Sequence, residues 1–160
     1  MLHYIDVHLI TVEVPDEISL CIYLSGCVNR CMSCHSPELL RTDFGYILSD
    51  YFSDLVELYV KRMTCICFLG EGSGLKNDRD ELIGHSKYSH TKGLKTCLYS
   101  GRNTSIEDWM STFDYVKTGA FDVERGALQK RATNQIFYKK DGRSYRNITS
   151  KFWLASHETN

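Results

Sequence analysis

The chain has 160 residues, of which 42% are hydrophobic and 12% aromatic, a composition typical of folded proteins and not of disordered ones. Nineteen basic residues balance twenty acidic ones, which argues against a polybasic nucleic-acid-binding or membrane-surface role. The length suits one domain, residues 1–160, and falls short of the roughly 250 residues of a complete eight-unit β/α barrel.

The N-terminal part predicts two strands, a loop and a helix. Residues 3–14 alternate between polar and apolar side chains as a strand does, and residues 18–25 (ISLCIYLS) form an apolar run typical of a buried strand. Residues 26–37 are polar and rich in cysteine, which predicts a loop. Apolar side chains at helical spacing then predict a helix over 47–62, with Ser49-Asp50 as its N-terminal cap.

The middle of the chain alternates strands with helices. Residues 64–69 (TCICFL) read as a second buried strand, and a weaker helical pattern covers 78–90. A fourth strand is predicted at 94–99, a short helix at 105–111 and a fifth strand at 114–118.

The C-terminal part reads as a β-hairpin whose turn lies at Asp141-Gly142. Strands that alternate with helices, as they do before this hairpin, favour an α/β fold with a largely parallel sheet.

In such folds the chemistry gathers where the parallel strands end. Four segments of this sequence follow predicted strands: the cysteine loop, Gly70-Glu71-Gly72, Ser100-Gly101-Arg102 and Thr118-Gly119. We therefore expect these segments to form a single site.

The cysteine loop holds three thiols, Cys27, Cys31 and Cys34. Thiolates are the usual ligands of iron–sulfur clusters, and three of them around a cubane leave one iron open to a further ligand. The odd total of seven cysteines and the absence of a signal-peptide pattern at the N-terminus indicate the reducing cytoplasm, in which disulfides are rare. The remaining cysteines lie in apolar strand segments and are predicted to be buried: Cys21, Cys65, Cys67 and Cys97.

A structural zinc site of three cysteines and one histidine is the alternative. His35 directly follows Cys34, however, and adjacent residues rarely reach the same tetrahedral ion. The sequence also lacks the second pair of ligands that zinc sites usually contain.

The segment GCVNRCMSCHSPEL resembles the CxxxCxxC motif of radical S-adenosylmethionine enzymes. More narrowly, it is similar to the activating proteins of anaerobic ribonucleotide reductase. Further similarities follow in the same order as in that family: Gly70-Glu71-Gly72, Tyr99 to Arg102, Asp114 to Gly119 and Thr133-Asn134-Gln135.

The resemblance implies a shortened partial (β/α) barrel that binds a [4Fe–4S] cluster and S-adenosylmethionine, with Cys27, Cys31 and Cys34 as the metal ligands. It assigns the following residues to cofactor binding: Gly70, Glu71, Gly72, Ser100 and Thr118. The family has two glycines before the acidic residue that binds the amino group, whereas this chain has Gly70-Glu71-Gly72. Either Glu71 still binds the amino group, or backbone carbonyls do so.

By the same resemblance, the reduced cluster cleaves S-adenosylmethionine, and the resulting radical abstracts hydrogen from a glycine of the large reductase subunit. A reducing protein such as a flavodoxin would supply the electron. A short chain has little material to enclose a small substrate, which fits a protein substrate. Arg30, Arg102 and Asn134-Gln135 are candidate contacts with the cofactor or the partner. The alternatives are a radical enzyme that acts on another protein or peptide, and a non-catalytic zinc or iron–sulfur module.

Overall fold

A computed structural model describes residues 1–29, 37–41 and 44–154. Its strands are β1 (His3–Ile10), β2 (Ser19–Leu24), β3 (Tyr46–Ile47), β4 (Cys65–Leu69), β5 (Lys95–Tyr99), β6 (Tyr115–Thr118), β7 (Ile136–Asp141) and β8 (Ser144–Asn147). Its helices are α1 (Leu48–Tyr59), α2 (Lys76–Thr91) and α3 (Lys151–Leu154), with two 3₁₀ turns, η1 (Pro37–Leu40) and η2 (Asp108–Thr112).

All eight strands form one open sheet in the order β3-β1-β2-β4-β5-β6-β7-β8. The four central strands, β2, β4, β5 and β6, run parallel, whereas both sides of the sheet are antiparallel. The α/β class is therefore confirmed, but the expected largely parallel sheet is parallel only in its centre. Short connections explain two of the antiparallel pairs, β1–β2 and β7–β8, because residues 11–18 and the turn after Asp141 are too short for the crossover that parallel neighbours need.

The predicted helix over 47–62 is α1, but the predicted cap is wrong. The helix begins at Leu48 after Ile47, which belongs to the short strand β3 and makes no side-chain capping bond. Ser49-Asp50 lies inside the first turn, where an acidic side chain still stabilises the positive end of the helix dipole. Within the described ranges, no helix has the length and apolar character needed to cross a bilayer.

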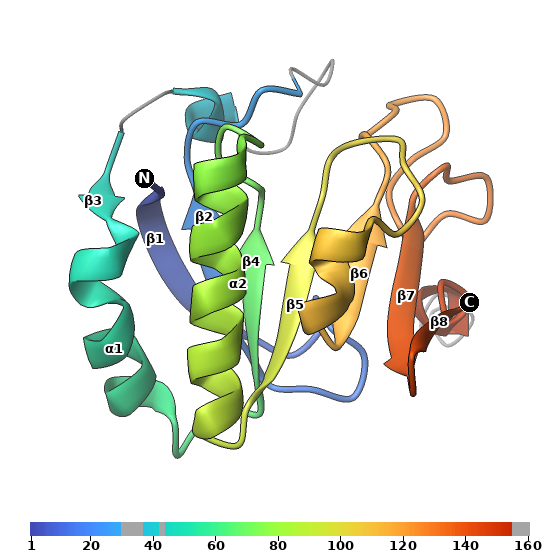
Figure 1. Ribbon diagram of the computed structural model, residues 1–160. Coiled ribbons are helices and arrows are strands. Elements are labelled where there is room, and N and C mark those ends of the chain that lie inside the picture. The colour runs from blue at the N-terminus through green and yellow to red at the C-terminus, as the bar shows by residue number, and fades with distance from the viewer. Residues whose placement is uncertain (30–36, 42–43, 155–160) are drawn as a thin grey trace.

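Two apolar clusters cover the two faces of the sheet. On one face α1 and α2 lie next to each other (Figure 1) and bury Phe52, Val56 and Leu82 against the central strands. On the other face Val14, Leu128 and Phe152 pack against residues of the strands. The four cysteines predicted to be buried all belong to this second cluster, and each is fully shielded from solvent. The sequence prediction for these four thiols is confirmed.

The loop between β1 and β2 is fixed to the sheet by a buried carboxylate. Glu17 is 7% exposed, and its carboxylate accepts hydrogen bonds from Thr64 Oγ1 (2.5 Å) and from the Tyr115 hydroxyl (2.9 Å). Lys95 Nζ lies 2.9 Å from the same carboxylate, which raises the pKa of Lys95. Glu17 therefore joins the loop to β5 and β6 at the amino ends of these strands.

Replacing this carboxylate by an amide tests its role. Glu17→Gln keeps the size of the side chain but weakens the bonds from Tyr115 and Lys95, so we expect a loss of about 1–3 kcal/mol in the free energy of unfolding. Urea titration followed by circular dichroism measures this loss. Glu57→Gln removes an exposed ion pair with Lys92 and should change the midpoint little. Equal effects of the two substitutions would contradict the structural role of Glu17.

Candidate functional site

The carboxyl ends of β4, β5 and β6 meet at one edge of the sheet, as the sequence predicts for its Gly70, Ser100 and Thr118 segments. Their adjacency follows from the parallel register of the three strands. Three backbone hydrogen bonds continue beyond the strands: Gly70 N to Tyr99 O (3.1 Å), Ser100 N to Lys117 O (2.7 Å) and Gly119 N to Arg102 O (2.8 Å). The three segments therefore form one continuous surface.

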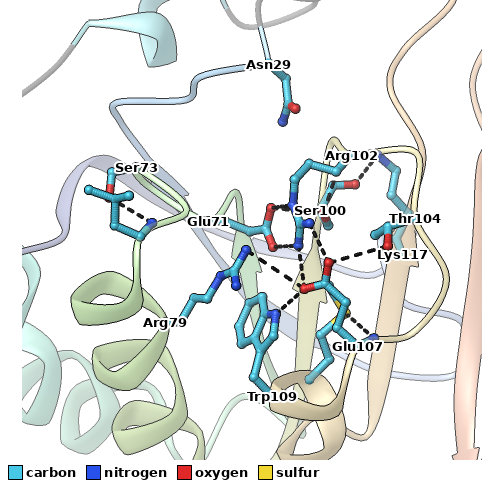
Figure 2. A network of polar contacts seen from close by, with 12 residues as sticks. Asn29, Glu71, Ser73, Arg79, Ser100, Arg102, Thr104, Glu107, Trp109 and Lys117 are labelled. Atoms are coloured by element: carbon cyan, nitrogen blue, oxygen red, sulfur yellow. Dashed lines mark hydrogen bonds and ion pairs between the residues drawn. The ribbon is translucent and has the colours of Figure 1, made fainter.

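The centre of this surface is an ion pair between Glu71 and Arg102. Glu71 Oε2 accepts a bond from Arg102 Nε, and Glu71 Oε1 accepts one from Arg102 Nη2, both at 2.9 Å. Ser100 Oγ donates to Glu71 Oε2 at 3.0 Å. Figure 2 shows the carboxylate and the guanidinium facing each other as a two-pronged pair. Because Glu71 is only 6% exposed, this pairing is what allows its charge to stay buried.

A second carboxylate, that of Glu107, holds Arg102 from its other side. Arg102 Nη1 lies 2.5 Å from Glu107 Oε1, and the indole of Trp109 also donates to Glu107 (Figure 2). The bond from Arg102 is the main cause that lowers the pKa of Glu107 to about 2, and the two carboxylates together raise the pKa of Arg102. Arg79 extends the network, with its guanidinium 5.0 Å from the Trp109 ring centroid and Nη2 3.9 Å from Glu107.

Two glycines of the site occupy positions that no side chain fits. Gly72 has φ +61°, and a Cβ there would lie 2.5 Å from Leu2 Cδ2 and 2.8 Å from Asp78 Oδ2. Gly119 has φ +106°, and a Cβ there would lie 2.9 Å from Gln135 Cα. Both glycines are thus required by close approach of the backbone and by conformation. In the irregular Gly70-Glu71-Gly72 segment, the second glycine lets the turn after β4 pack against α2.

The start of the cysteine loop reaches the same surface. Cys27 is half-buried, and Asn29 Nδ2 lies within hydrogen-bonding distance of its sulfur at 3.7 Å. The amide of Asn29 also packs on Gly101, where a Cβ would come within 2.5 Å of Nδ2. The described part of the loop therefore contacts the turn after β5, which agrees with the predicted single site. Arg30, Cys31 and Cys34 lie outside the described residues.

The five described cysteines differ in their surroundings. Desolvation raises the pKa of Cys65 and Cys67 and raises that of Cys97 to about 11, and a hydrogen bond with Cys67 raises that of Cys21. Among residues 1–29, 37–41 and 44–154, no three His, Cys, Asp or Glu side chains are arranged to hold a metal ion. Because two of the three predicted ligands lie outside these ranges, the cluster stays a prediction.

A polar cavity of about 450 Å³ opens beside the ion pair, at the ends of β5 and β6. Thr118, a predicted cofactor residue, contributes to it and is 2% exposed. Hydroxyl and amide groups line it at Asn103, Thr104, Ser105 and Asn134, and the remaining lining residues are Gly119, Asp122, Arg125 and Ile136. The Oδ1 atom of Asn134 is buried and has no hydrogen-bond partner in the described part of the chain. This acceptor is available to a donor on a ligand.

Sequence reasoning missed several residues of this site. Arg79 belongs to α2, Trp109 to η2 and Glu107 is the N-cap of η2, so their side chains converge only after the chain has folded. Asn103 and Asp122 lie in loops without a recognisable motif. The one sequence signal for this part of the site is that the acidic Glu107 follows the basic Arg102 by five positions. Acidic and basic residues at this spacing are too common in sequences to indicate a site.

Comparison of the chain with protein-family models, with curated proteins and with solved structures found no match.

Removing the cation of the central pair tests the coupling between its members. Arg102→Leu should destabilise the protein by about 3 kcal/mol, because the Glu71 carboxylate then stays buried without a counterion. Adding Glu71→Gln should recover most of this loss, since an amide needs no counterion and still accepts the bond from Ser100. Urea unfolding of the wild type, both single variants and the double variant gives the coupling free energy. Strictly additive losses would contradict the pairing.

Acid should weaken the network through Glu107. Its pKa is about 2 in the folded protein against a usual value of 4.5, so its ionised form is stabilised by folding. This contribution is fully present above about pH 4.5 and is lost as the pH falls towards 2. Glu107→Gln should therefore flatten the dependence of the unfolding free energy on pH in this window. The exposed Glu124→Gln serves as the matched control and should keep the wild-type slope.

Proposed function

We propose that this chain is a radical S-adenosylmethionine activase that generates a glycyl radical on the large subunit of anaerobic ribonucleotide reductase. The observation that carries the proposal is the ordered set of motifs, from Cys27-Cys31-Cys34 to Thr118-Gly119, combined with the meeting of the described segments at one edge of the sheet. In this proposal the open sheet is a shortened form of the partial barrel of these enzymes.

The Glu71–Arg102 pair is suited to the amino-acid part of S-adenosylmethionine. That part carries an ammonium and a carboxylate group, and the pair offers one carboxylate and one guanidinium next to each other. A zwitterion that enters between them exchanges one ion pair for two, so neither protein charge is left buried without a partner. Ser100 and Glu107 keep the two side chains oriented during the exchange. This favours Glu71, rather than backbone carbonyls alone, as the contact of the amino group.

The polar cavity beside the pair suits a nucleoside. Its volume of about 450 Å³ lies in the usual range for small-molecule sites. The Thr104 and Thr118 hydroxyls and the Asn103 and Asn134 amides supply donors and acceptors for ribose hydroxyls and an adenine edge. In this arrangement the amino-acid part lies at Glu71 and the nucleoside at Thr118.

The thiols of the cysteine loop are better suited to bind an iron–sulfur cluster than the thiols of the sheet are. Cys27 is half-buried and close to Asn29, whose amide can donate to a ligated sulfur and so tune the potential. Cys21, Cys65 and Cys67 are fully buried with raised pKa values, which disfavours the thiolate that metals need. When bound at Cys27, Cys31 and Cys34, a [4Fe–4S] cluster supplies the electron that cleaves the sulfonium.

A protein substrate fits this site, because the site is open to the surface at the carboxyl ends of the parallel strands. The cavity opens to the surface, and the described residues place no further domain over it. A large partner that docks on the edge would exclude water from the radical, a role that a small chain does not fulfil alone.

Anaerobic reconstitution tests the proposal. The loaded protein should contain about four irons per chain and should release methionine and 5′-deoxyadenosine from S-adenosylmethionine after reduction. Cys27→Ala should lose iron and cleavage, whereas the matched control Cys97→Ala, which removes a buried thiol of the sheet, should retain both. Incubation with an anaerobic reductase should then yield a glycyl radical detectable by electron paramagnetic resonance.

Three outcomes would overturn the proposal in different ways. An iron-loaded protein that leaves S-adenosylmethionine intact would exclude radical chemistry. A colourless protein that binds zinc would favour a structural metal module. Cleavage without a radical on the reductase would favour a radical enzyme that modifies another protein or peptide.

A further inference from the structure

Positive charge is concentrated in the last part of the described chain. Residues 121–154 contain eight basic and three acidic side chains, whereas residues 1–120 contain eleven basic and sixteen acidic ones. The β7–β8 hairpin alone carries Lys139, Lys140, Arg143 and Arg146 against the single acid Asp141. None of these four cations forms an ion pair with any residue that the structure describes.

Two of these cations lie directly opposite each other. Lys139 on β7 and Arg146 on β8 are partners in the antiparallel register. Like charges in directly opposed positions destabilise a hairpin. The carboxylate of Asp16, in the loop between β1 and β2, forms its ion pair with Lys151 at 2.6 Å and not with a hairpin cation. Basic side chains also keep edge strands from aggregating, but that role does not require two of them to face each other.

A cavity of about 420 Å³ lies where the hairpin meets the start of α3. It is lined by Gln135, Asn147, Thr149 and Trp153, among others, and it shares Ile136 with the cavity of the candidate site. Gln135 is 6% exposed, and it is one of the residues that line this cavity. A side-chain amide can both donate and accept hydrogen bonds, so it can bind a polar group that enters the cavity.

The third feature of this region is that β8 is an edge strand. β8 is the last strand of the sheet, and no described strand pairs with its outer edge. An extended chain can add to such an edge through backbone hydrogen bonds, with side-chain pockets and charges deciding which chain binds.

We propose that the outer edge of β8, with Arg143, Arg146 and the cavity at Gln135, docks an extended acidic segment of a partner protein. The backbone of the segment would pair with β8, and its carboxylates would neutralise the hairpin cations. A polar side chain of the segment would enter the cavity and bond to the Gln135 amide. Strand spacing places Arg143 and Asn147 about 13 Å apart, which a segment of a few residues spans.

Single-stranded nucleic acid fits this surface less well, because single-strand sites stack the bases on exposed aromatic rings. The hydroxyl of Tyr145 donates to the carbonyls of Met110 and Phe113, and this ring packs towards the helical face of the sheet. Trp153 lies under the guanidinium of Arg131, 5.4 Å from the ring centroid. The proposal also does not depend on the activity proposed above, because an acidic peptide can bind here whether or not the chain cleaves S-adenosylmethionine.

Fluorescence anisotropy with the full chain tests the inference. The probe is a labelled peptide of alternating Glu and Thr residues, which has strand propensity and negative charge. Its Lys-Thr counterpart and a labelled single-stranded oligonucleotide serve as comparison probes. We expect the acidic peptide to bind at low ionic strength and the Lys-Thr peptide not to bind, with affinity falling as salt is added. Arg143→Ala/Arg146→Ala should weaken binding about tenfold.

A charge-matched control separates this surface from general attraction. Lys61→Ala/Lys87→Ala removes two exposed cations of the helical face and should leave the affinity unchanged. Gln135→Glu keeps the size of the side chain but places a negative charge in the cavity, so it should also weaken binding of the acidic peptide. Circular dichroism verifies that each variant is folded. Equal losses in both double variants, or tighter binding of the oligonucleotide than of the acidic peptide, would overturn the proposal.

Discussion

The structure of the candidate site depends on one constraint, that the Glu71 carboxylate is buried and must be neutralised. Arg102 fulfils this requirement with two hydrogen bonds, and its own remaining donors are then bound by Glu107. Trp109 and Arg79 in turn hold Glu107. Each member of the network therefore has its orientation fixed by the next. The charges are arranged before any ligand arrives, which is the condition under which electrostatic recognition is most effective.

The parallel centre of the sheet explains why this network lies where it does. Parallel strands that are neighbours in sequence end at the same edge, so Glu71 and Ser100 follow adjacent strands and come within 3.0 Å of each other. Gly72 and Gly119 allow the turns after these strands to approach their neighbours closely. The antiparallel strands at the sides of the sheet place the β7–β8 hairpin next to this edge, and Ile136 lines both cavities.

The parts of the fold that were predictable from the sequence are those with a long apolar pattern. β4, β5 and α1 bury one or both faces, so their side chains repeat at the period of the element. β3 and α3 were not predicted, because two and four residues are too few to show a period. At the site, the order of the segments could be predicted, but the partner of Glu71 could not. Arg102 is 31 positions away, and only the register of β4 and β5 brings the two together.

The same register separates the described cysteines into two chemical kinds. Cys21, Cys67 and Cys97 occupy aligned positions on three neighbouring strands and therefore lie in one row within an apolar cluster. Burial raises the pKa of Cys67 and Cys97, so these thiols stay protonated and act as small apolar side chains. Cys27 lies beyond the end of β2, half-buried and beside a polar amide. Strand position thus separates the buried thiols of the sheet from Cys27, which lies at the edge that carries Glu71 and Arg102.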